Sequence, residues 1–173
     1  ENDYYVPKVH NLNKQPTRFI KELIEPFQRL CLEFYNATGK KIVINDSYRS
    51  FERQVQLKNH PKYGGGAATP GTSDHGWGVA FDVNGTNEGG NWGKRDLRRY
   101  ESEVYKALTA LSNTSGFFNP TWAQPGGSNM ESWHWENITV RNQVYDQTLP
   151  DYAVPDPDEA PEGRTEPMTE PIE

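Results

Sequence analysis

The amino-acid sequence predicts an α+β fold in one domain, followed by a separate acidic segment. Two stretches of the chain have the apolar spacing of amphipathic helices, and three short apolar runs have the length of strands. These segments are mixed without the strand–helix–strand alternation of a doubly wound parallel sheet. With 173 residues, the chain is long enough to bury one hydrophobic core.

The first helix is predicted after a polar, extended lead-in of 16 residues. Apolar residues then recur every three or four positions, at Phe19, Ile20, Leu23, Ile24, Phe27, Leu30, Cys31 and Phe34. Pro26 predicts a kink or a break into two helices, because proline removes a backbone donor. Gly39 predicts the end of the helix. Cys31 is the only cysteine, so we expect a buried, unreactive thiol and no disulfide within the chain.

The later elements are shorter and are separated by turn-forming residues. Strands are predicted over 41–46, 79–83 and 133–138, and residues 143–145 are expected to close the fold. Ser50 is the predicted cap of a helix that runs to about Asn59, and a third helix is predicted from about 94 to 112. The glycines and prolines between 60 and 72 predict a loop.

The acidity of the chain is concentrated at one end. Residues 151–173 contain eight acids, one base and five of the thirteen prolines. We therefore expect a disordered tail or linker there. Such a segment could tether the domain to a larger protein or a virion. Residues 1–150, the predicted folded domain, contain 16 acids and 17 bases. This near-neutral balance does not support nucleic-acid binding. A mean hydropathy of -0.92 and the lack of a long apolar run predict no membrane span.

Two separate segments contain the residues of a candidate metal site. One contains His75 and Asp82, and the other contains Glu131 and His134. Two neutral imidazoles and a carboxylate suit zinc and leave a fourth position for water. A further carboxylate beside that water would act as the base in metal-assisted hydrolysis. From these residues alone, the other interpretation is a pair of histidines held by core hydrogen bonds and an aspartate in a turn.

Strand alternation predicts how some of these side chains point. Along 79–83, Asp82 would lie on the face opposite Phe81 and Val83. On the later strand, Glu136 would point as His134 does and is a candidate partner of that imidazole. The tryptophans are candidates to line a glycan or peptide groove, although aromatic residues more often belong to a core or its rim.

The spacing of these residues resembles the zinc D-alanyl-D-alanine peptidases. The segment Ser73-Asp-His75-Gly-Trp-Gly78-Val-Ala80-Phe-Asp82 matches every fixed position of their Ser-x-His-x-x-Gly-x-Ala-x-Asp signature. Glu131-Ser-Trp-His134 matches the second motif of the family, Glu-x-x-His, and Ser47-Tyr-Arg49-Ser50 resembles its Tyr-Arg-Ser segment. Because the order also agrees, residues 17–140 resemble VanY-type carboxypeptidases, VanX-type dipeptidases and related bacteriophage endolysins.

The resemblance implies a small domain with a central antiparallel sheet flanked by helices, the D-Ala-D-Ala metallopeptidase or hedgehog-like fold. It implies one Zn2+ per chain, with the ligands His75, Asp82 and His134. It also implies that Glu131 is the general base and that Arg49 polarises the scissile carbonyl, a role that suits a fixed guanidinium. The expected substrate contacts are Ser73, Gln54 and, as an aromatic beside a ligand, Trp133.

The sequence therefore predicts zinc-dependent hydrolysis of a peptide bond in peptidoglycan stem peptides. The sequence leaves two activities open. One is a D,D-carboxypeptidase that removes the terminal D-alanine, and the other is an endolysin-like endopeptidase that cuts inside the stem. The site of action would be extracellular, on the cell-wall side, or phage-borne, and the chain shows no signal-like apolar segment. The alternative is a non-catalytic, zinc-stabilised wall-binding or phage structural domain. The presence of both Glu131 and Arg49 favours an enzyme.

Overall fold

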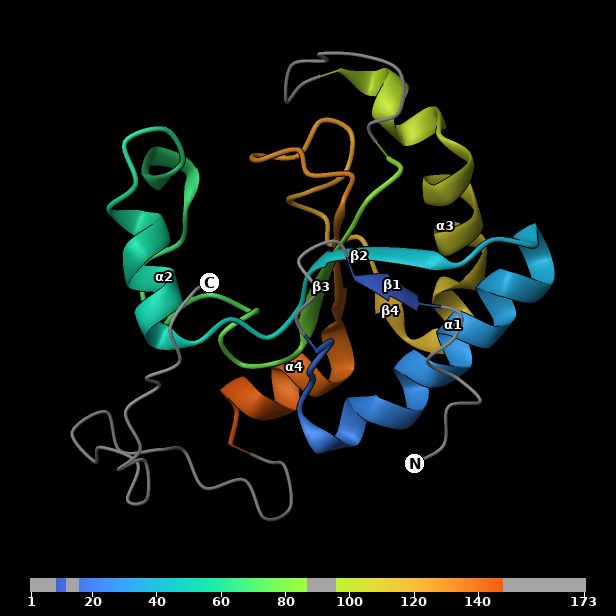
Figure 1. Ribbon diagram of the computed structural model, residues 1–173, viewed down its shortest axis with the longest axis horizontal. Helices are drawn as coiled ribbons and strands as arrows, with labels where there is room; N and C mark the ends of the chain where they lie inside the picture. The colour runs from blue at the N-terminus through green and yellow to red at the C-terminus, as the bar shows by residue number, and fades with distance from the viewer. Residues whose placement is uncertain (1–8, 12–15, 87–95, 148–173) are drawn as a thin grey trace, which may run out of the picture.

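A computed structural model of the chain describes residues 9–11, 16–86 and 96–147. The strands in this part form one sheet with the order β1-β2-β3-β5-β4 (Figure 1). They are β1 Val9–Asn11, β2 Ile42–Asp46, β3 Ala80–Val83, β4 Phe117–Phe118 and β5 His134–Asn137. Neighbouring strands from β2 to β4 pair antiparallel, and β1 adds a parallel strand at one edge. The prediction of an α+β fold with a central antiparallel sheet is confirmed.

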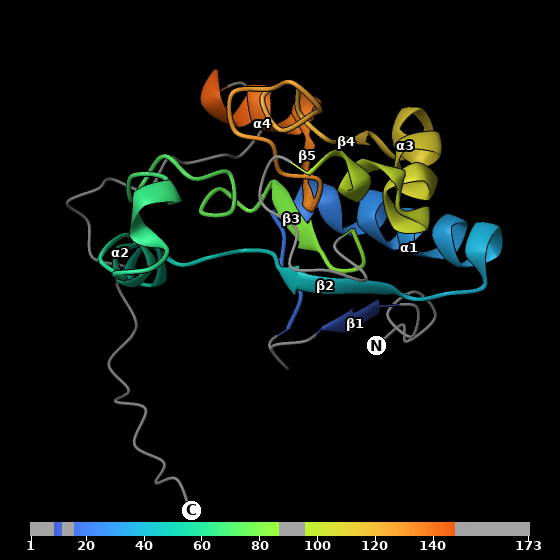
Figure 2. The same cartoon turned by 90° about the horizontal axis from the view of Figure 1, so that it is seen from above.

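Two helices lie side by side and cover the sheet, and a third lies apart from them. Helix α1 (Ile24–Thr38) packs against α3 (Glu103–Ser115). Helix α2 (Phe51–Lys58) and the turns after it lie at the opposite end of the molecule from α1 and α3 (Figures 1 and 2). Helix α4 (Ile138–Tyr145) directly follows β5. No helix in the described part of the chain is long and apolar enough to cross a membrane.

The core lies between α1 and the sheet and includes a cluster of phenylalanines. The ring of Phe27 on α1 lies 5.3 Å from that of Phe81 on β3 and 6.1 Å from that of Phe117 on β4. Phe81 and Val83 are buried in this core, as the alternation along β3 predicts. Asp82 therefore lies on the other face of the strand, away from the phenylalanines.

The boundaries of α1 differ from the prediction in a way that the position of Pro26 explains. Residues Lys21–Leu23 form a 3-10 turn, and the α-helix begins at Ile24, so Pro26 lies in its first turn. The first four amides of a helix have no partner within it, so proline removes no hydrogen bond there. The kink or break predicted at Pro26 is therefore wrong: the helix is continuous through Pro26, and the change from 3-10 turn to α-helix lies before it, at Ile24. Gly39 ends the helix with φ 70°, as predicted.

The second half of the chain departs further from the prediction. Residues Leu97–Glu101 form a 3-10 turn, and α3 begins only after Ser102, whose hydroxyl accepts a hydrogen bond from the amide of Tyr105. Residues 143–145, expected to close the fold, belong instead to α4, which Asn137 caps by accepting from the amide of Val140 at 3.0 Å. The predicted helix start at 94–95 and the predicted tail at 151–173 lie outside the described residues.

Candidate metal centre

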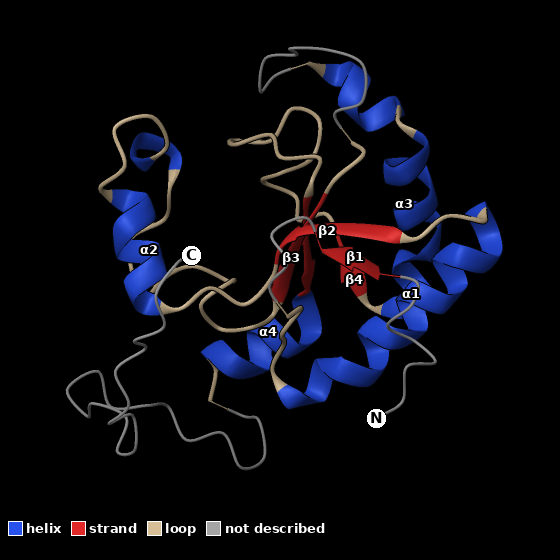
Figure 3. Cartoon of the chain, in the orientation of Figure 1, coloured by secondary structure: helices blue, strands red, loops and turns tan. Residues whose placement is uncertain are grey.

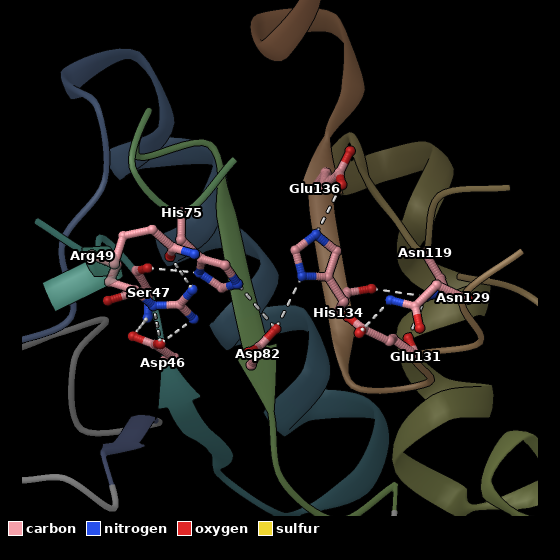
Figure 4. A network of polar contacts seen from close by, with 11 residues as sticks. Asp46, Ser47, Arg49, His75, Asp82, Asn119, Asn129, Glu131, His134 and Glu136 are labelled. Carbon is pink, nitrogen blue, oxygen red and sulfur yellow. Dashed lines mark hydrogen bonds and ion pairs between the residues drawn. The ribbon is translucent and has the colours of Figure 1, made fainter. Parts of the chain in front are cut away.

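The structure brings His75, Asp82 and His134 together. The Asp82 carboxylate lies between the two imidazoles, with Oδ1 3.2 Å from Nε2 of His75 and 3.0 Å from Nδ1 of His134 (Figure 4). Asp82 on β3 and His134 on β5 are direct partners across the antiparallel pair. Opposite residues in such a pair have neighbouring side chains, so this register brings two of the three groups together.

A tight turn before β3 supplies the third group, His75. The amide of Gly78 donates to the carbonyl of His75, and Gly78 has φ 68°. A Cβ atom at this glycine would lie 2.8 Å from the backbone nitrogen of Ile20. Both the conformation and the close approach of the chain therefore require glycine here. The turn directs the imidazole of His75 toward β3 and β5.

Hydrogen bonds to the outer ring nitrogens set the orientation of both imidazoles. Nδ1 of His75 lies 2.8 Å from the carbonyl oxygen of Ser47, which can only accept, so Nδ1 carries the proton. Nε2 of His134 lies 2.8 Å from Oε1 of Glu136, and Oε2 of that buried carboxylate accepts from Arg141. In the neutral form of the two rings, this arrangement would leave the lone pairs of Nε2 of His75 and Nδ1 of His134 facing Asp82.

The three facing atoms fit a divalent cation. In the neutral form of the imidazoles, two nitrogen lone pairs meet a carboxylate oxygen, and all of the candidate ligand atoms lie within 4.8 Å of one another. Burial alone would raise the pKa of Asp82, but the two imidazoles lower it below its usual range. Burial would likewise lower the pKa of His134, but hydrogen bonds to Asp82 and Glu136 outweigh it and raise the pKa to about 10. The pocket therefore favours positive charge, which a metal ion would supply in place of a proton.

A second acidic group shares His134 but is satisfied within the protein. Asp74, His134 and Glu136 also offer ligand atoms close to one another. The Glu136 carboxylate pairs with Arg141, and Asp74 accepts a hydrogen bond from the hydroxyl of Tyr145. The pKa of Asp74 is raised, first by burial and then by the charge of Glu136. We therefore treat this group as the support of His134 and not as a second metal site.

A cavity of about 600 Å³ adjoins the candidate ligands. Its lining includes most of the residues that the sequence predicts for the site, namely Arg49, Ser73, His75, Asp82, Glu131, Trp133 and His134. Its volume is within the roughly 300–1,000 Å³ that is usual for small-ligand sites. Residues that are far apart in the sequence therefore meet around one space.

Glu131 lies on the turn before β5, at the wall of this cavity. One of its carboxylate oxygens accepts from Nδ2 of Asn129 at 2.8 Å. The buried amide of Asn119 donates to the backbone carbonyls of Glu131, at 2.9 Å, and His134, at 2.8 Å (Figure 4). Asn119 thus connects the candidate base to the candidate ligand. Sequence analysis missed Asn119, because a single asparagine in a loop has no recognisable pattern.

Arg49 is fixed at the cavity wall by two side chains. Its Nε donates to Asp46 at 2.9 Å, and one terminal nitrogen donates to Oε1 of Gln54 at 2.7 Å. Gln54 is only 1% exposed, and its Nε2 donates to the carbonyl of Ala68 at 2.7 Å. Gln54 is not among the residues that line the cavity in the described part of the chain. The structure therefore places it behind Arg49, whereas a substrate contact was expected.

The other expected substrate contacts lie at the cavity. Ser73 is buried and begins the turn that contains His75, since its carbonyl accepts from the amide of Gly76. Trp133 is half-buried, with the guanidinium carbon of Arg99 5.0 Å from its ring centre. Trp122, one of the tryptophans that the sequence offered as groove candidates, also lines the cavity, and its ring centre lies 5.0 Å from that of His134.

Comparisons with known proteins identify a family that matches the chain and several solved structures that are similar to it. A sequence profile of the VanY family, described as D-alanyl-D-alanine carboxypeptidase, matches residues 17–140. No curated protein matches the chain in a sequence search. The chain is similar to VanYB solved in complex with D-alanine-D-alanine, with 25% identity, a TM-score of 0.49 and coverage of 77% of this chain and 80% of that one.

Two further solved structures are similar. One is a D,D-pentapeptidase VanY from a VanB-type resistance cassette in complex with Zn(II), with 24% identity, a TM-score of 0.49 and coverage of 79% and 83%. The other is the LD-carboxypeptidase LdcB, with 18% identity, a TM-score of 0.57 and coverage of 82% of this chain and 71% of that one. The similarity to LdcB supports the fold.

Proposed function

Because the chain belongs to the VanY family of D-alanyl-D-alanine carboxypeptidases, we propose that it is a zinc D,D-carboxypeptidase that removes the terminal D-alanine from peptidoglycan stem peptides. The observation that carries this proposal is that two histidines meet carboxylates and an arginine at one cavity. The contributing side chains are Asp46, Arg49, His75, Asp82, Glu131 and His134. The substrate is a cell-wall polymer, so the proposed site of action is the wall side of the cell membrane.

The proposed zinc ligands are Nε2 of His75, Oδ1 of Asp82 and Nδ1 of His134. Two imidazole nitrogens and one carboxylate oxygen are a donor set typical of catalytic zinc. When bound, zinc supplies a Lewis acid that polarises the scissile carbonyl and makes a water molecule more acidic. The protein contributes the orientation of the ligands through Ser47 and Glu136, which hold the outer nitrogens of the two rings.

Glu131 is the proposed general base. Asn129 holds one of its carboxylate oxygens, and Asn119 holds its backbone, so the side chain has a defined position at the cavity wall. From this position the carboxylate would take a proton from the attacking water and then pass it to the amine of the departing D-alanine. Glu131 does not belong to the group of three candidate ligands, so its proposed role is proton transfer and not metal binding.

Arg49 is the proposed group that stabilises negative charge on the scissile carbonyl oxygen. Asp46 and Gln54 hold its guanidinium before substrate arrives, and such preorganisation lowers the cost of stabilising the transition state. Ser73 and Trp133 are the proposed substrate contacts, and Trp122 joins them because it also lines the cavity. We assign Gln54 to positioning Arg49, because both ends of its amide are already bonded within the protein.

The test is digestion of purified peptidoglycan, and of a synthetic stem peptide that ends in D-Ala-D-Ala, followed by mass spectrometry. The proposal predicts free D-alanine and a stem shortened by one residue, with hydrolysis at least about 100-fold slower in Glu131→Gln. New internal amino termini would instead show an endopeptidase. If the zinc-loaded chain binds stem peptides but releases no product from several wall types, the domain is non-catalytic.

A further inference from the structure

The cavity has two walls that differ in chemistry. One wall comes from α2 and the turns after it, and includes Arg53, Leu57, Lys62 and Tyr63. The other wall comes from the segment between β4 and β5, and includes Trp122, Asn129, Glu131 and Trp133. Figure 3 shows α2 and its following turns as a lobe separate from the sheet. The candidate metal ligands lie between these walls, so a peptide bound at the ligands would contact both of them.

Every acidic side chain of the cavity lining is engaged by another group. Asp46 pairs with Arg49, and Asp82 lies between the two imidazoles. Asp74 accepts from the hydroxyl of Tyr145, and Glu131 accepts from Asn129.

Two positively charged side chains of the cavity lining have no acidic partner among the described residues. Within the described residues, neither Arg53 nor Lys62 forms an ion pair with an acidic side chain. The guanidinium of Arg53 donates to the neutral amide of Gln56 at 3.3 Å. The ammonium of Lys62 lies 5.2 Å from the ring centre of Tyr63. Both partners are uncharged, so the α2 wall carries two positive charges that no acid of the lining balances.

We propose that Arg53 and Lys62 form an anion subsite for a carboxylate of the peptide substrate other than the carboxylate at its C-terminus. The peptide identity of the ligand rests on the proposed function. Arg49, Ser73 and the metal ligands account for the end of the substrate at the bond that is cut. Within the described residues, the side chains of Arg53 and Lys62 contact Gln56 and Tyr63 and form no hydrogen bond or ion pair with Arg49, Ser73 or a proposed ligand, so we assign them to a group elsewhere on the substrate. A stem peptide offers such a group in the α-carboxylate of its D-glutamate, which is neutral when that residue is amidated.

The test compares two stem peptides that end in D-Ala-D-Ala and differ only in a D-glutamate carboxylate or its carboxamide. Binding is measured by tryptophan fluorescence, since Trp122 and Trp133 line the cavity. The protein is the full chain with zinc, carrying Glu131→Gln so that the peptides are not consumed. We expect the carboxylate peptide to bind about fivefold more tightly at low salt, the scale for two exposed ion pairs, and the preference to weaken as added salt shortens the screening length.

A pair of double variants assigns the preference to this wall. Arg53→Gln/Lys62→Gln should bring the affinity ratio of the two peptides to about one. The matched control, Lys40→Gln/Lys106→Gln, removes the same charge at α3, where the two lysines pair with Glu103 and Glu101, and should keep the ratio. An affinity ratio near one in the Glu131→Gln chain without further changes would overturn the proposal. An affinity ratio that Arg53→Gln/Lys62→Gln leaves unchanged would also overturn it. So would a failure of both peptides to bind.

The same experiment separates this proposal from the proposed function. Equal binding of both peptides together with release of D-alanine by the parent chain would reject the subsite and support the carboxypeptidase. A preference that depends on Arg53 and Lys62, without release of D-alanine, would reject the carboxypeptidase and support the subsite.

Discussion

Replacing Glu136 by glutamine should weaken zinc binding although Glu136 is not a proposed ligand. Its carboxylate is 0% exposed, with Oε1 2.8 Å from Nε2 of His134 and Oε2 bonded to Arg141. The amide keeps the shape of the side chain but removes the charge that favours Nε2–H on the imidazole. It can also turn its NH2 group toward Nε2, which would favour the opposite tautomer and place the proton on the nitrogen that faces Asp82.

The size of the effect follows from the bonds that are lost. A hydrogen bond to a charged group contributes about 1.5–3 kcal/mol. Loss of the outer partner of a metal-binding histidine typically lowers metal affinity about 10–100-fold, or roughly 1.4–2.7 kcal/mol, which agrees with that value. The second bond, to Arg141, contributes less to metal binding, because Arg141 does not touch a proposed ligand and is partly exposed to solvent.

The assay is competition for zinc with a chelator of known affinity, with circular dichroism to confirm the fold. Glu131→Gln is the matched control: it makes the same chemical change at another carboxylate of the site, and it should change zinc affinity by less than about threefold. The reasoning would be refuted if folded Glu136→Gln bound zinc as tightly as the parent chain, or if both variants lost affinity equally.

Three further predictions concern parts of the site and the core. Gly78→Ala should lower the melting temperature, because φ 68° costs a non-glycine residue roughly 1–2 kcal/mol and the new Cβ would lie 2.8 Å from the nitrogen of Ile20. It should also weaken zinc binding, because Gly78 belongs to the turn that positions His75. An unchanged melting curve would contradict this. Gln54→Ala should lower kcat/KM about tenfold while zinc affinity stays the same, since it releases Arg49 without touching a ligand; loss of zinc would show a different role. Cys31 should react with a thiol reagent only as the chain unfolds, because burial raises the pKa of its thiol to about 12; rapid labelling of the native protein would contradict its position in the core.

The sequence predicted the centre of the site because its residues lie in local patterns. His75 and Asp82 belong to one short motif, and alternation along β3 correctly placed Asp82 opposite Phe81. The same alternation along β5 placed Glu136 on the side of His134, where the structure shows their contact. These relations depend only on neighbours within a few positions, which a sequence pattern records.

Other parts of the structure depend on contacts between distant segments. Asn119 joins Glu131 to His134 across 12 and 15 positions, and no local spacing predicts this. Gln54 is held behind Arg49 because the chain after α2 brings the carbonyl oxygen of Ala68 close to it, where that oxygen accepts a hydrogen bond from the Gln54 amide. Strands β1 and β4 have only three and two residues, too few for an alternating pattern, and are defined by their partners in the sheet.

Parallel measurement of zinc content and release of D-alanine for three forms of the chain tests the central claim most directly. The parent chain should bind one zinc and release terminal D-alanine. Glu131→Gln should keep the zinc and lose at least about 100-fold in hydrolysis, because the amide cannot accept a proton. His134→Ala should lose zinc and activity together, because it removes a ligand. Full hydrolysis by Glu131→Gln, or full zinc binding by folded His134→Ala, would contradict the account.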